Sequence, residues 1–454
     1  MTTTPLMIVV LAAGKGTRMK SDLPKVLHAV GGRSMLGHVL DLAVSSRAEK
    51  LAVVVGPGQD SVRAAALAIV PGAEVFTQEQ QRGTADAVKA ATQAIATHNG
   101  DVIVLYADTP LIKPATIDQL RASLDAGAAV AVLGFEADDP GAYGRLLTDT
   151  DGTLLAIREH KDASEAERQI KLCNSGVMAF RRANLAGVLA RIGNANAKGE
   201  YYLTDAVEII RADGGRAAVI TCEESEVLGV NSRVELAEAE AIFQRRRRRQ
   251  AMEEGATLIA PETVWFSYDT SIGRDVVIQP NVYFGVGVSI ADGAEILANC
   301  HFEQASIGKG ARVGPFARLR PGANLGANVH IGNFVEVKNA VIKDGAKANH
   351  LAYLGDGTVG EKANIGAGTI FCNYDGFFKH RTNIGAGAFV GSNSSLVAPV
   401  NIGEGAYIGS GSVITKDVAA GSLALERATQ EERPGWAEKF AIVMRKRKAA
   451  ASKR

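Results

Sequence analysis

The sequence is poor in cysteine and in aromatic residues, and its charges nearly cancel. Its four cysteines are scattered, with no CxxC pair and no Cys/His cluster, so neither a disulfide framework nor a zinc site is indicated. A formal net charge of +1 over 454 residues provides no overall field that would attract nucleic acid or a membrane surface. No hydrophobic run approaches the length of a transmembrane helix. We therefore expect no nucleic-acid partner and no membrane span.

The N-terminus also lacks the features of a secretory signal. The first residues, MTTTPLMIVVLAAGKG, have no charged segment ahead of their apolar run, and that run ends in glycines. We interpret this run as the first strand of a domain. Together with the absence of a disulfide framework, it predicts a bacterial-type cytoplasmic location or another reducing compartment.

What the chain has in abundance is a six-residue repeat in its second half. Every sixth residue is aliphatic over 307–337 and again over 384–414, and the next residue is usually glycine or another small residue. Neither a helix nor a flat strand, with periods of about 3.6 and 2, repeats in this way. Short strands coiled into a triangular prism do, with the aliphatic side chains stacked along the axis. The second half is therefore expected to be a parallel β-helix.

This repeat resembles the left-handed hexapeptide-repeat helix, a fold common among acyltransferases, over about residues 258–422. The period is interrupted at 339–352 and again at 372–383, where the sequence reads CNYDGFFKHRTN. Insertions in a coiled repeat project as loops from one face, which is often the functional face. The repeat by itself leaves open whether the prism catalyses a reaction or only assembles subunits.

The first half alternates between strand and helix patterns. Strand patterns at 7–11, 51–55, 101–107 and 128–135 alternate with helical patterns at 34–46, 60–69, 83–98 and 114–126. This order predicts an α/β domain with a mostly parallel sheet that is covered on both faces. Ligands of such sheets bind at the carboxyl ends of the strands.

Two charged segments lie outside these patterns. Residues 233–253 have the composition of an exposed helix, with five consecutive arginines at 245–249. They indicate either a nucleic-acid patch or a solvated helix between domains, and the flanking glutamates favour the linker. The basic, alanine-rich segment 434–454 is expected to be a frayed tail, with binding to an anionic partner as the alternative. The predicted divisions are a domain at 1–232, a linker helix at 233–255, and a β-helix domain with its tail at 256–454.

A glycine-rich loop follows the first strand, in the string LAAGKGTRM at 11–19. Gly14 and Gly16 let backbone amides approach a phosphate, while Lys15 and Arg18 supply positive charge. The loop lacks the third glycine of a dinucleotide fingerprint and the GxxxxGK[ST] pattern of a Walker A loop. Taken alone, it is equally compatible with a plain strand–helix turn.

The longer string changes this interpretation. LAAGKGTRM followed by Leu23-Pro24-Lys25 resembles the signature of sugar-nucleotide pyrophosphorylases, which join a nucleoside monophosphate to a sugar 1-phosphate and release pyrophosphate. Further strings agree with it in order: QEQQRGT at 78–84, YAD at 106–108, YGR at 143–145, EHKD at 159–162, NSG at 174–176, EYYLTD at 200–205 and GVN at 229–231. With the hexapeptide repeat, nearly the whole chain resembles the bifunctional bacterial family of N-acetylglucosamine-1-phosphate uridylyltransferase / glucosamine-1-phosphate N-acetyltransferase.

The resemblance implies a Rossmann-like nucleotidyltransferase domain. Asp108 and Asn231 would hold Mg²⁺, a hard cation that takes oxygen ligands; taken alone, Asp108 could instead cap the turn before Pro110. Lys25 and Arg18 would be catalytic, because they neutralise the triphosphate and the charge that develops at the α-phosphorus. The implied contacts to UTP and UDP-N-acetylglucosamine are Leu11, Ala12, Gly14, Lys25, Gln78, Gly83, Thr84, Gly144, Glu159, Asn174 and Asn231.

In the second domain, acyl transfer from a thioester needs a base that takes a proton from the amine. His350 lies in the first interruption of the repeat, and an imidazole titrates near neutrality. A lone histidine is more often a surface or packing residue, so its role rests mainly on the resemblance. The implied contacts to glucosamine 1-phosphate are Arg320, Lys338, Tyr353 and Asn364, although Arg320 and Lys338 could simply be solvated strand edges. The implied contacts to acetyl-CoA are Ala367, Asn373, Tyr374, Ser392, Ser410 and Arg427.

Both halves together favour a bifunctional enzyme of UDP-N-acetylglucosamine synthesis. It would acetylate glucosamine 1-phosphate with acetyl-CoA, and then transfer UMP from UTP to N-acetylglucosamine 1-phosphate with Mg²⁺ as metal. The resemblance also implies a homotrimer, with the acetyl-CoA cleft between neighbouring β-helices and the segment 372–383 reaching across it. The alternative is a single-activity pyrophosphorylase whose β-helix is only an oligomerisation scaffold, with an uninterrupted repeat and no convergent polar groups.

Overall fold

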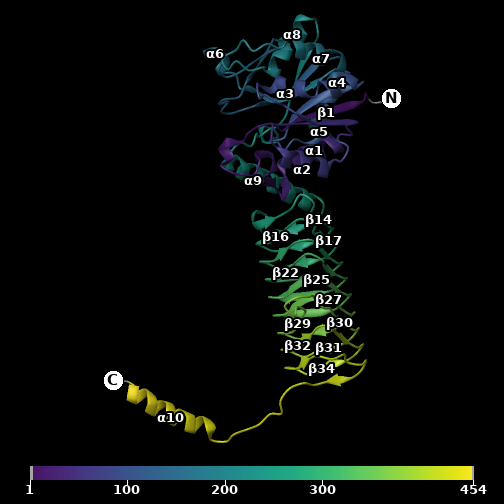
Figure 1. Ribbon diagram of the computed structural model, residues 1–454, viewed down its shortest axis with the longest axis vertical. Coiled ribbons are helices and arrows are strands. Elements are labelled where there is room, and N and C mark those ends of the chain that lie inside the picture. Colours follow the sequence, from purple (N-terminus) through teal and green to yellow (C-terminus); the bar gives the residue numbers. More distant parts are fainter. Residues whose placement is uncertain (1–3, 452–454) are drawn as a thin grey trace. The chain divides into compact units, whose positions relative to one another are not determined.

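The computed structural model describes residues 4–451, which divide into two compact units (Figure 1). The first unit runs to Ala251 and includes Trp265–Asp269. The second comprises Met252–Val264 and the chain from Thr270 onward. Within residues 4–451, no helix combines the length and the apolar character that a membrane crossing requires.

A mixed β-sheet forms the centre of the first unit. Its strands are β1 (Leu6–Leu11), β4 (Lys50–Val55), β5 (Glu74–Thr77), β6 (Asp101–Tyr106), β7 (Val130–Glu136), β8 (Arg145–Thr148), β9 (Leu154–Arg158), β10 (Leu172–Phe180) and β11 (Ala217–Thr221). The main path has the order β11-β7-β10-β6-β1-β4-β5. β1 pairs in parallel with β4 and β6, whereas β10 runs antiparallel to β6 and β7. The predicted α/β domain is confirmed, with one reversed strand in the main path that the alternation of patterns did not reveal.

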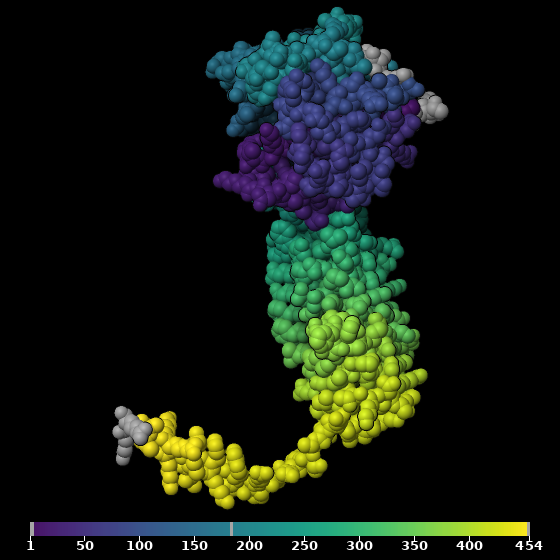
Figure 2. Space-filling model, viewed as in Figure 1, coloured from purple at the N-terminus to yellow at the C-terminus, as the bar shows by residue number. Residues whose placement is uncertain are grey.

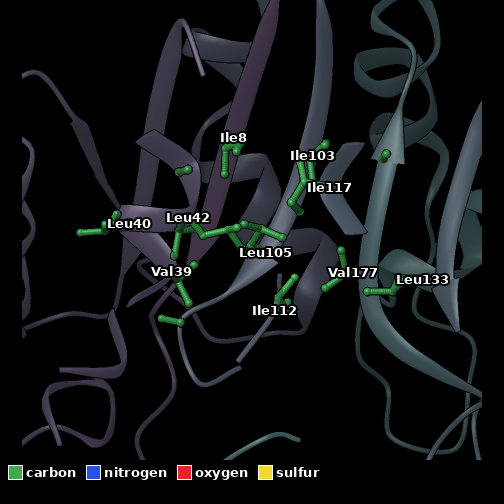
Figure 3. Close-up of a cluster of buried hydrophobic side chains, with 14 of the residues drawn as sticks. Ile8, Val39, Leu40, Leu42, Ile103, Leu105, Ile112, Ile117, Leu133 and Val177 are labelled. Carbon is green, nitrogen blue, oxygen red and sulfur yellow. The ribbon is translucent and has the colours of Figure 1, made fainter. Parts of the chain in front are cut away.

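Both faces of this sheet are buried. Along β1, Ile8 and Val10 belong to one apolar cluster, and Val9 and Leu11 belong to the other, as strand alternation requires. Helices of the first cluster are α1 (Met35–Ser45), α2 (Asp60–Ile69) and α5 (Pro114–Asp125). Helices of the second are α3 (Thr84–Ala90), α4 (Thr92–Thr97), α7 (Arg182–Arg191) and α8 (Ala206–Ala212). Figure 3 shows part of the first cluster, including Ile8 and Leu105 of the sheet and Leu42 of α1.

The long helix α9 (Arg233–Glu253) buries side chains in its middle, between Ala239 and Gln244, and Ala251 near its end. Ala239, Ile242 and Phe243, three and four residues apart, join Val30 in a small apolar cluster of the first unit. The expectation of a helix solvated on all sides is therefore wrong. Its apolar stripe is short and is followed directly by the arginine run, which dominates the composition.

The second unit is a parallel β-helix, as the repeat predicts. Each strand pairs in parallel with the strand one coil later, so Ile331, Ala348 and Ile365 lie in register. One sheet of 10 strands runs from β12 (Thr257–Leu258) to β36 (Leu423–Ala424), and a sheet of 15 strands contains the other strands of the unit. The space-filling view shows these coils as one continuous stack, coloured from teal-green to yellow (Figure 2). The strands that contain or adjoin the residues discussed below are β22 (Arg318–Leu319), β24 (His330–Asn333), β25 (Glu336–Ile342), β26 (Lys347–His350), β27 (Tyr353–Val359), β28 (Asn364–Ile365), β29 (Ile370–Cys372), β30 (Thr382–Ile384), β31 (Phe389–Val390) and β34 (Tyr407–Ile408).

The first predicted interruption of the repeat, at 339–352, is wrong. The axial stack continues through Val337, Ile342, Ala348 and Leu354, all of them buried. The interval between Val337 and Ile342 is shorter than six residues, and Ala348 fills one of the inward positions. The aliphatic period therefore shifts although the coil continues without a break. Leu354 is fully buried and is the inward residue of its coil, whereas the adjacent Tyr353 is partly exposed.

The second interruption, at 372–383, is a loop, as predicted. It leaves the stack between β29 and β30, and Asp375 organises its tip. The Asp375 carboxylate accepts hydrogen bonds from the backbone amides of Phe377 and Phe378, both at 2.7 Å, and lies 2.7 Å from Nε2 of His380. The amide of Phe378 and the ring of His380 hold the pKa of Asp375 well below its usual range.

The end of the chain forms the helix α10 (Trp436–Ala451), where the sequence predicted a frayed tail. Alanine, lysine, arginine and methionine all favour the helical conformation, which explains the difference. None of the side chains at 436–451 is buried. The last part of the predicted tail, 452–454, lies outside the described residues.

We expect Leu354→Ala to destabilise the second unit by about 2–5 kcal/mol, because it opens a cavity in the axial stack. Tyr353→Ala removes a side chain from the outer surface and should cost much less. Thermal unfolding followed by circular dichroism measures both effects. Equal destabilisation by the two substitutions would contradict the shifted register.

Candidate active sites

A cavity of about 270 Å³ opens in the first unit where β1 and β6 end. Leu11 and Tyr106, the last residues of these strands, are in register and both line the cavity. Many of the predicted residues meet here: Leu11, Ala12, Gly14, Lys25, Gln78, Gly83, Thr84 and Asp108. The cavity therefore lies where ligands bind in sheets of this kind.

Two loops around the cavity need glycine for their geometry. Gly16 has a φ of +62°, and a Cβ at that position would lie 2.5 Å from Cβ of Lys25. Gly83 has a φ of +122°, and a Cβ there would lie 2.5 Å from the carbonyl oxygen of Tyr201. Only glycine combines these backbone angles with such close approach. The buried amide of Gln78 donates to the Gly83 carbonyl at 3.1 Å and so ties that loop to the cavity wall.

Lys25 lies between the two predicted metal ligands. Its ammonium donates to Oδ2 of Asp108 at 2.5 Å and to Oδ1 of Asn231 at 3.0 Å. Nδ2 of Asn231 donates to the Gly229 carbonyl at 3.2 Å, which turns Oδ1 toward the ammonium. The two oxygens thus converge on one positive charge, and such a donor pair fits Mg²⁺, which keeps several water and phosphate oxygens as its other ligands. Within the described part of the chain, no group of three or more His, Cys, Asp or Glu residues could hold a metal ion.

Three of the implied UTP and UDP-N-acetylglucosamine contacts, Gly144, Glu159 and Asn174, form a group beside the cavity. The backbone amide of Asn174 donates to the Gly144 carbonyl at 2.8 Å, and a Cβ on Gly144 would lie 3.5 Å from Oε1 of Glu159. Oδ1 of Asn174 accepts from the amide of Gly176 at 3.0 Å. A Cβ on Gly176 would lie 2.8 Å from the ring of Tyr106, a cavity residue, so this group adjoins the cavity.

Two carboxyl groups near these contacts have raised pKa values. Burial raises the pKa of Glu159, whose Oε1 lies 3.4 Å from the hydroxyl of Thr204. Burial, reinforced by the carboxylates of Glu208 and Glu159, raises the pKa of Asp205 to about 6. Perturbed carboxyl groups are concentrated at functional sites. Asp205 belongs to the EYYLTD string, but nothing in that string marks it as partly buried, and it was not predicted as a contact.

Arg18 lies apart from these groups. It is exposed on the short helix η1 (Thr17–Met19) and is not among the residues that line the cavity. Its predicted contact with a triphosphate therefore requires the side chain to turn toward the cavity.

In the second unit, parallel register places His350 in a column with several implied acetyl-CoA contacts. Each of the strands β24, β26, β28, β31 and β34 has one buried inward residue, and the residue two positions after it belongs to the column. The members of the column are Asn333, His350, Ala367, Ser392 and Ser410. Arg427 joins the column, because its Nη1 donates to the Ser410 carbonyl at 2.7 Å. Asn333 was not predicted. Its Oδ1 lies 2.7 Å from Nδ1 of His350, a contact that only the register between coils reveals.

Arg320 and Lys338 occupy equivalent positions of successive coils, because β22 and β25 pair in register. Nη1 of Arg320 lies 2.8 Å from Oε1 of Glu336, and Glu336 is in register with Tyr353. Three implied sugar-phosphate contacts therefore lie on one face of the prism, together with an acidic residue that was not predicted.

Asn373 is held by a buried carboxylate. Its Nδ2 donates to Oδ2 of Asp356 at 2.5 Å and lies 3.4 Å from the hydroxyl of Tyr353. Asp356 also accepts from Nδ2 of Asn339 at 2.6 Å. Sequence reasoning missed Asp356, whose pairing depends on two neighbouring coils. The adjacent Tyr374 is exposed.

Asn364 is separated from the other implied sugar contacts in the single chain. It lies with His350 in the 10-stranded sheet, whereas Arg320, Lys338 and Tyr353 lie in the 15-stranded sheet. The strands that carry His350 and Tyr353 adjoin at one corner, so the predicted acetyltransferase residues spread over two faces of the prism.

Comparison with known proteins covers both units. Residues 8–194 match the MobA-like NTP transferase domain, and residues 304–339 and 381–416 match the bacterial transferase hexapeptide (six repeats). The chain is 59% identical over 432 residues to the bifunctional protein GlmU of Azorhizobium caulinodans, over 95% of this chain and 96% of that protein.

Two further relatives carry the same name. GlmU of Xanthobacter autotrophicus is 59% identical over 435 residues, which cover 96% of this chain and 97% of that protein. GlmU of Sphingopyxis alaskensis is 55% identical over 454 residues, which cover 99% of each chain. The family predicted from the motifs is confirmed, and the chain belongs to the GlmU family of bifunctional proteins.

Proposed function

We propose that the chain carries out two successive reactions, one in each unit. The second unit acetylates glucosamine 1-phosphate with acetyl-CoA, and the first transfers UMP from UTP to N-acetylglucosamine 1-phosphate, releasing pyrophosphate. The observation that carries this proposal is the gathering of each predicted set in its own unit. Eight predicted residues line one cavity, and His350 stands in a column with Ala367, Ser392 and Ser410. A β-helix that served only as a scaffold would not need these convergent polar groups.

In the first unit, the sugar phosphate oxygen attacks the α-phosphorus in line and pyrophosphate leaves, so no side-chain nucleophile is required. The residues of the chain position the reactants and neutralise charge. Lys25 is close to the glycine loop, since a Cβ on Gly14 would lie 3.9 Å from its Nζ, and it is well placed to meet phosphate oxygens there. Mg²⁺ held by Asp108 and Asn231 would supply further positive charge to the phosphates.

In the second unit, the amine of glucosamine attacks the thioester carbonyl. A new C–N bond forms, the C–S bond breaks, and the amine must give up a proton. With the amide oxygen of Asn333 facing the ring at 2.7 Å, Nδ1 of His350 carries the hydrogen, because an amide oxygen only accepts. Nε2 then keeps its lone pair and takes the proton from the amine. Arg320 and Lys338 bind the sugar phosphate in this proposal.

A trimer is supported by an exposed apolar ridge next to this site. Phe316, Phe334 and Leu351 are exposed, and their φ angles are +56°, +57° and +50°. Bulky side chains rarely adopt this conformation, which costs about 1–3 kcal/mol and persists where the surroundings or a function require it. Leu351 directly follows His350, so contact between copies at this ridge would close the acetyl-CoA cleft. A reducing, cytoplasmic location fits the four free cysteines.

We expect Asp108→Ala to abolish uridylylation and to leave acetylation unchanged, because the two proposed sites share no residue. The assay supplies glucosamine 1-phosphate, acetyl-CoA, UTP and Mg²⁺, with each cosubstrate omitted in turn. Asp151→Ala, in an exposed turn, is the matched control and should retain both activities. Loss of both activities in folded Asp108→Ala protein would argue against separate sites.

We expect His350→Ala to lower acetylation about 10²–10⁴-fold, the usual effect of removing a positioned base. Asn333→Ala should lower kcat more than KM, because the imidazole loses the partner that fixes its tautomer, and Asn333→Asp, which keeps the acceptor, should restore most of kcat. Wild-type acetylation should decline on acidification, since a protonated imidazole accepts no proton. Uridylylation of supplied N-acetylglucosamine 1-phosphate is the control. An Asn333→Ala variant with normal kcat would exclude the proposed pair.

Phe334→Asn tests the trimer. Asparagine tolerates the left-handed conformation, so the coil should remain folded while the ridge loses an apolar group. We expect dissociation in analytical ultracentrifugation and loss of acetylation with uridylylation retained. Tyr283→Asn, an exposed aromatic position on another coil, serves as control. A monomer that acetylates at the full rate would refute the shared cleft.

A further inference from the structure

The cation position of the first unit is filled by the chain itself. Lys25 is only 9% exposed, and its ammonium touches one oxygen of each proposed metal ligand, Asp108 and Asn231. The two ligands are rigidly placed. Asp108 follows β6, and the backbone amide of Asn231 donates to Oε2 of Glu235 at 2.7 Å. The donor pair is therefore preformed and already paired with a positive charge.

We propose that Lys25 is a resident counter-ion which screens Asp108, so that the site accepts Mg²⁺ as the metal–nucleotide complex and binds the free ion poorly. This inference rests on the proposed uridylyltransferase function. The ammonium lies 2.5 Å from Oδ2 of Asp108, and a metal held by Asp108 and Asn231 would bring a second positive charge against the same two side chains. The two cations would therefore compete for this pair.

The local geometry lets only the end of Lys25 move. A Cβ on Gly16 would lie 2.5 Å from Cβ of Lys25, so the backbone of that loop packs tightly against the root of the side chain. The ammonium, by contrast, lies beside Gly14 at the cavity wall. Lysine carries a compact charge on a flexible stem. The triphosphate of an arriving nucleotide gives the ammonium a new anionic partner at the glycine loop, and that exchange frees Asp108 for the metal.

The exchange also explains why a basic residue is buried against a metal ligand. Without nucleotide, an unpaired Asp108 carboxylate in a partly closed cavity would be costly, and Lys25 removes that cost. With nucleotide, the same charge is delivered to the phosphates, where the reaction needs it. The site thus becomes competent for metal only when a phosphate-bearing substrate is present.

The test measures binding of Mn²⁺, as a paramagnetic substitute for Mg²⁺, to the full chain without nucleotide by electron paramagnetic resonance. Lys25→Met should bind Mn²⁺ at least tenfold more tightly than wild type. Lys15→Met is the matched control, since it removes a positive charge from the same glycine loop without touching Asp108, and its affinity should stay near that of wild type. Adding Asp108→Asn to Lys25→Met should remove the gain. A non-hydrolysable UTP analogue should raise the wild-type affinity strongly and that of Lys25→Met much less.

The outcomes separate this inference from the function on which it rests. If Lys25→Met binds Mn²⁺ no better than wild type, while Asp108→Asn weakens binding in the presence of the UTP analogue, the resident counter-ion is overturned and the metal site stands. If Asp108→Asn alters binding in neither condition, the metal site itself is overturned. Circular dichroism of each variant establishes folding. If Lys25→Met is unstable, the increase in Mn²⁺ affinity that the UTP analogue produces in the wild type supplies an independent readout.

Discussion

Pairing of each coil with the next is the constraint on which the second unit depends. The amide of His330 donates to the carbonyl of Ala346 at 3.0 Å, and that of Lys347 donates to the carbonyl of Ala363 at 2.9 Å, so backbone groups are satisfied one coil away. The same register stacks the inward side chains into a buried apolar core. It also stacks the outward ones, and functional groups distant in sequence become direct neighbours. The column that contains His350 is a product of the core's own periodicity.

The first unit positions its residues by a different principle. Its sheet is buried on both faces, so polar groups can gather only where the strands end. β1 and β6 lie side by side in parallel, and the loops that follow them bring Gly14 and Asp108 to the same edge. Lys25 enters from a separate short helix and balances the charge there. In each unit, therefore, accessible polar groups gather at the edge of a buried apolar core.

Much of this could be predicted from the sequence. The six-residue period and the alternation of strand and helix patterns both reflect packing that repeats along the chain. The β-helix and the α/β domain were therefore predictable. Residues in the motif strings were predictable as a set because the resemblance carries them together. His350 was predicted partly from an interruption of the repeat, and that part of the reasoning is wrong, since its coil is not interrupted. One short interval and the small core residue Ala348 conceal the repeat there.

What could not be predicted depends on contacts between coils or on burial. Asn333 faces His350, Glu336 faces Arg320, and Asp356 holds Asn373, each pair being set by register that no local pattern shows. The raised pKa of Asp205 follows from burial among other carboxylates. The basic, alanine-rich composition at 434–454 predicts a frayed tail because its charges repel one another, whereas the strong helical propensity of the same residues favours the observed helix.

The coil register also restricts how a protein of this kind can change its length during evolution. A coil can be one residue shorter than its neighbour and keep its inward residue in place, since Ile331 pairs both with Val313 of an 18-residue coil and with Ala348 of a 17-residue coil. Larger gains and losses should be confined to whole coils, or to loops that leave and rejoin the stack at the same level, as the segment between β29 and β30 does. A loop of that type is free to vary in sequence and size, while each coil must bring its inward residue back into register with the next. The β-helix thus keeps its functional groups at fixed positions along its axis.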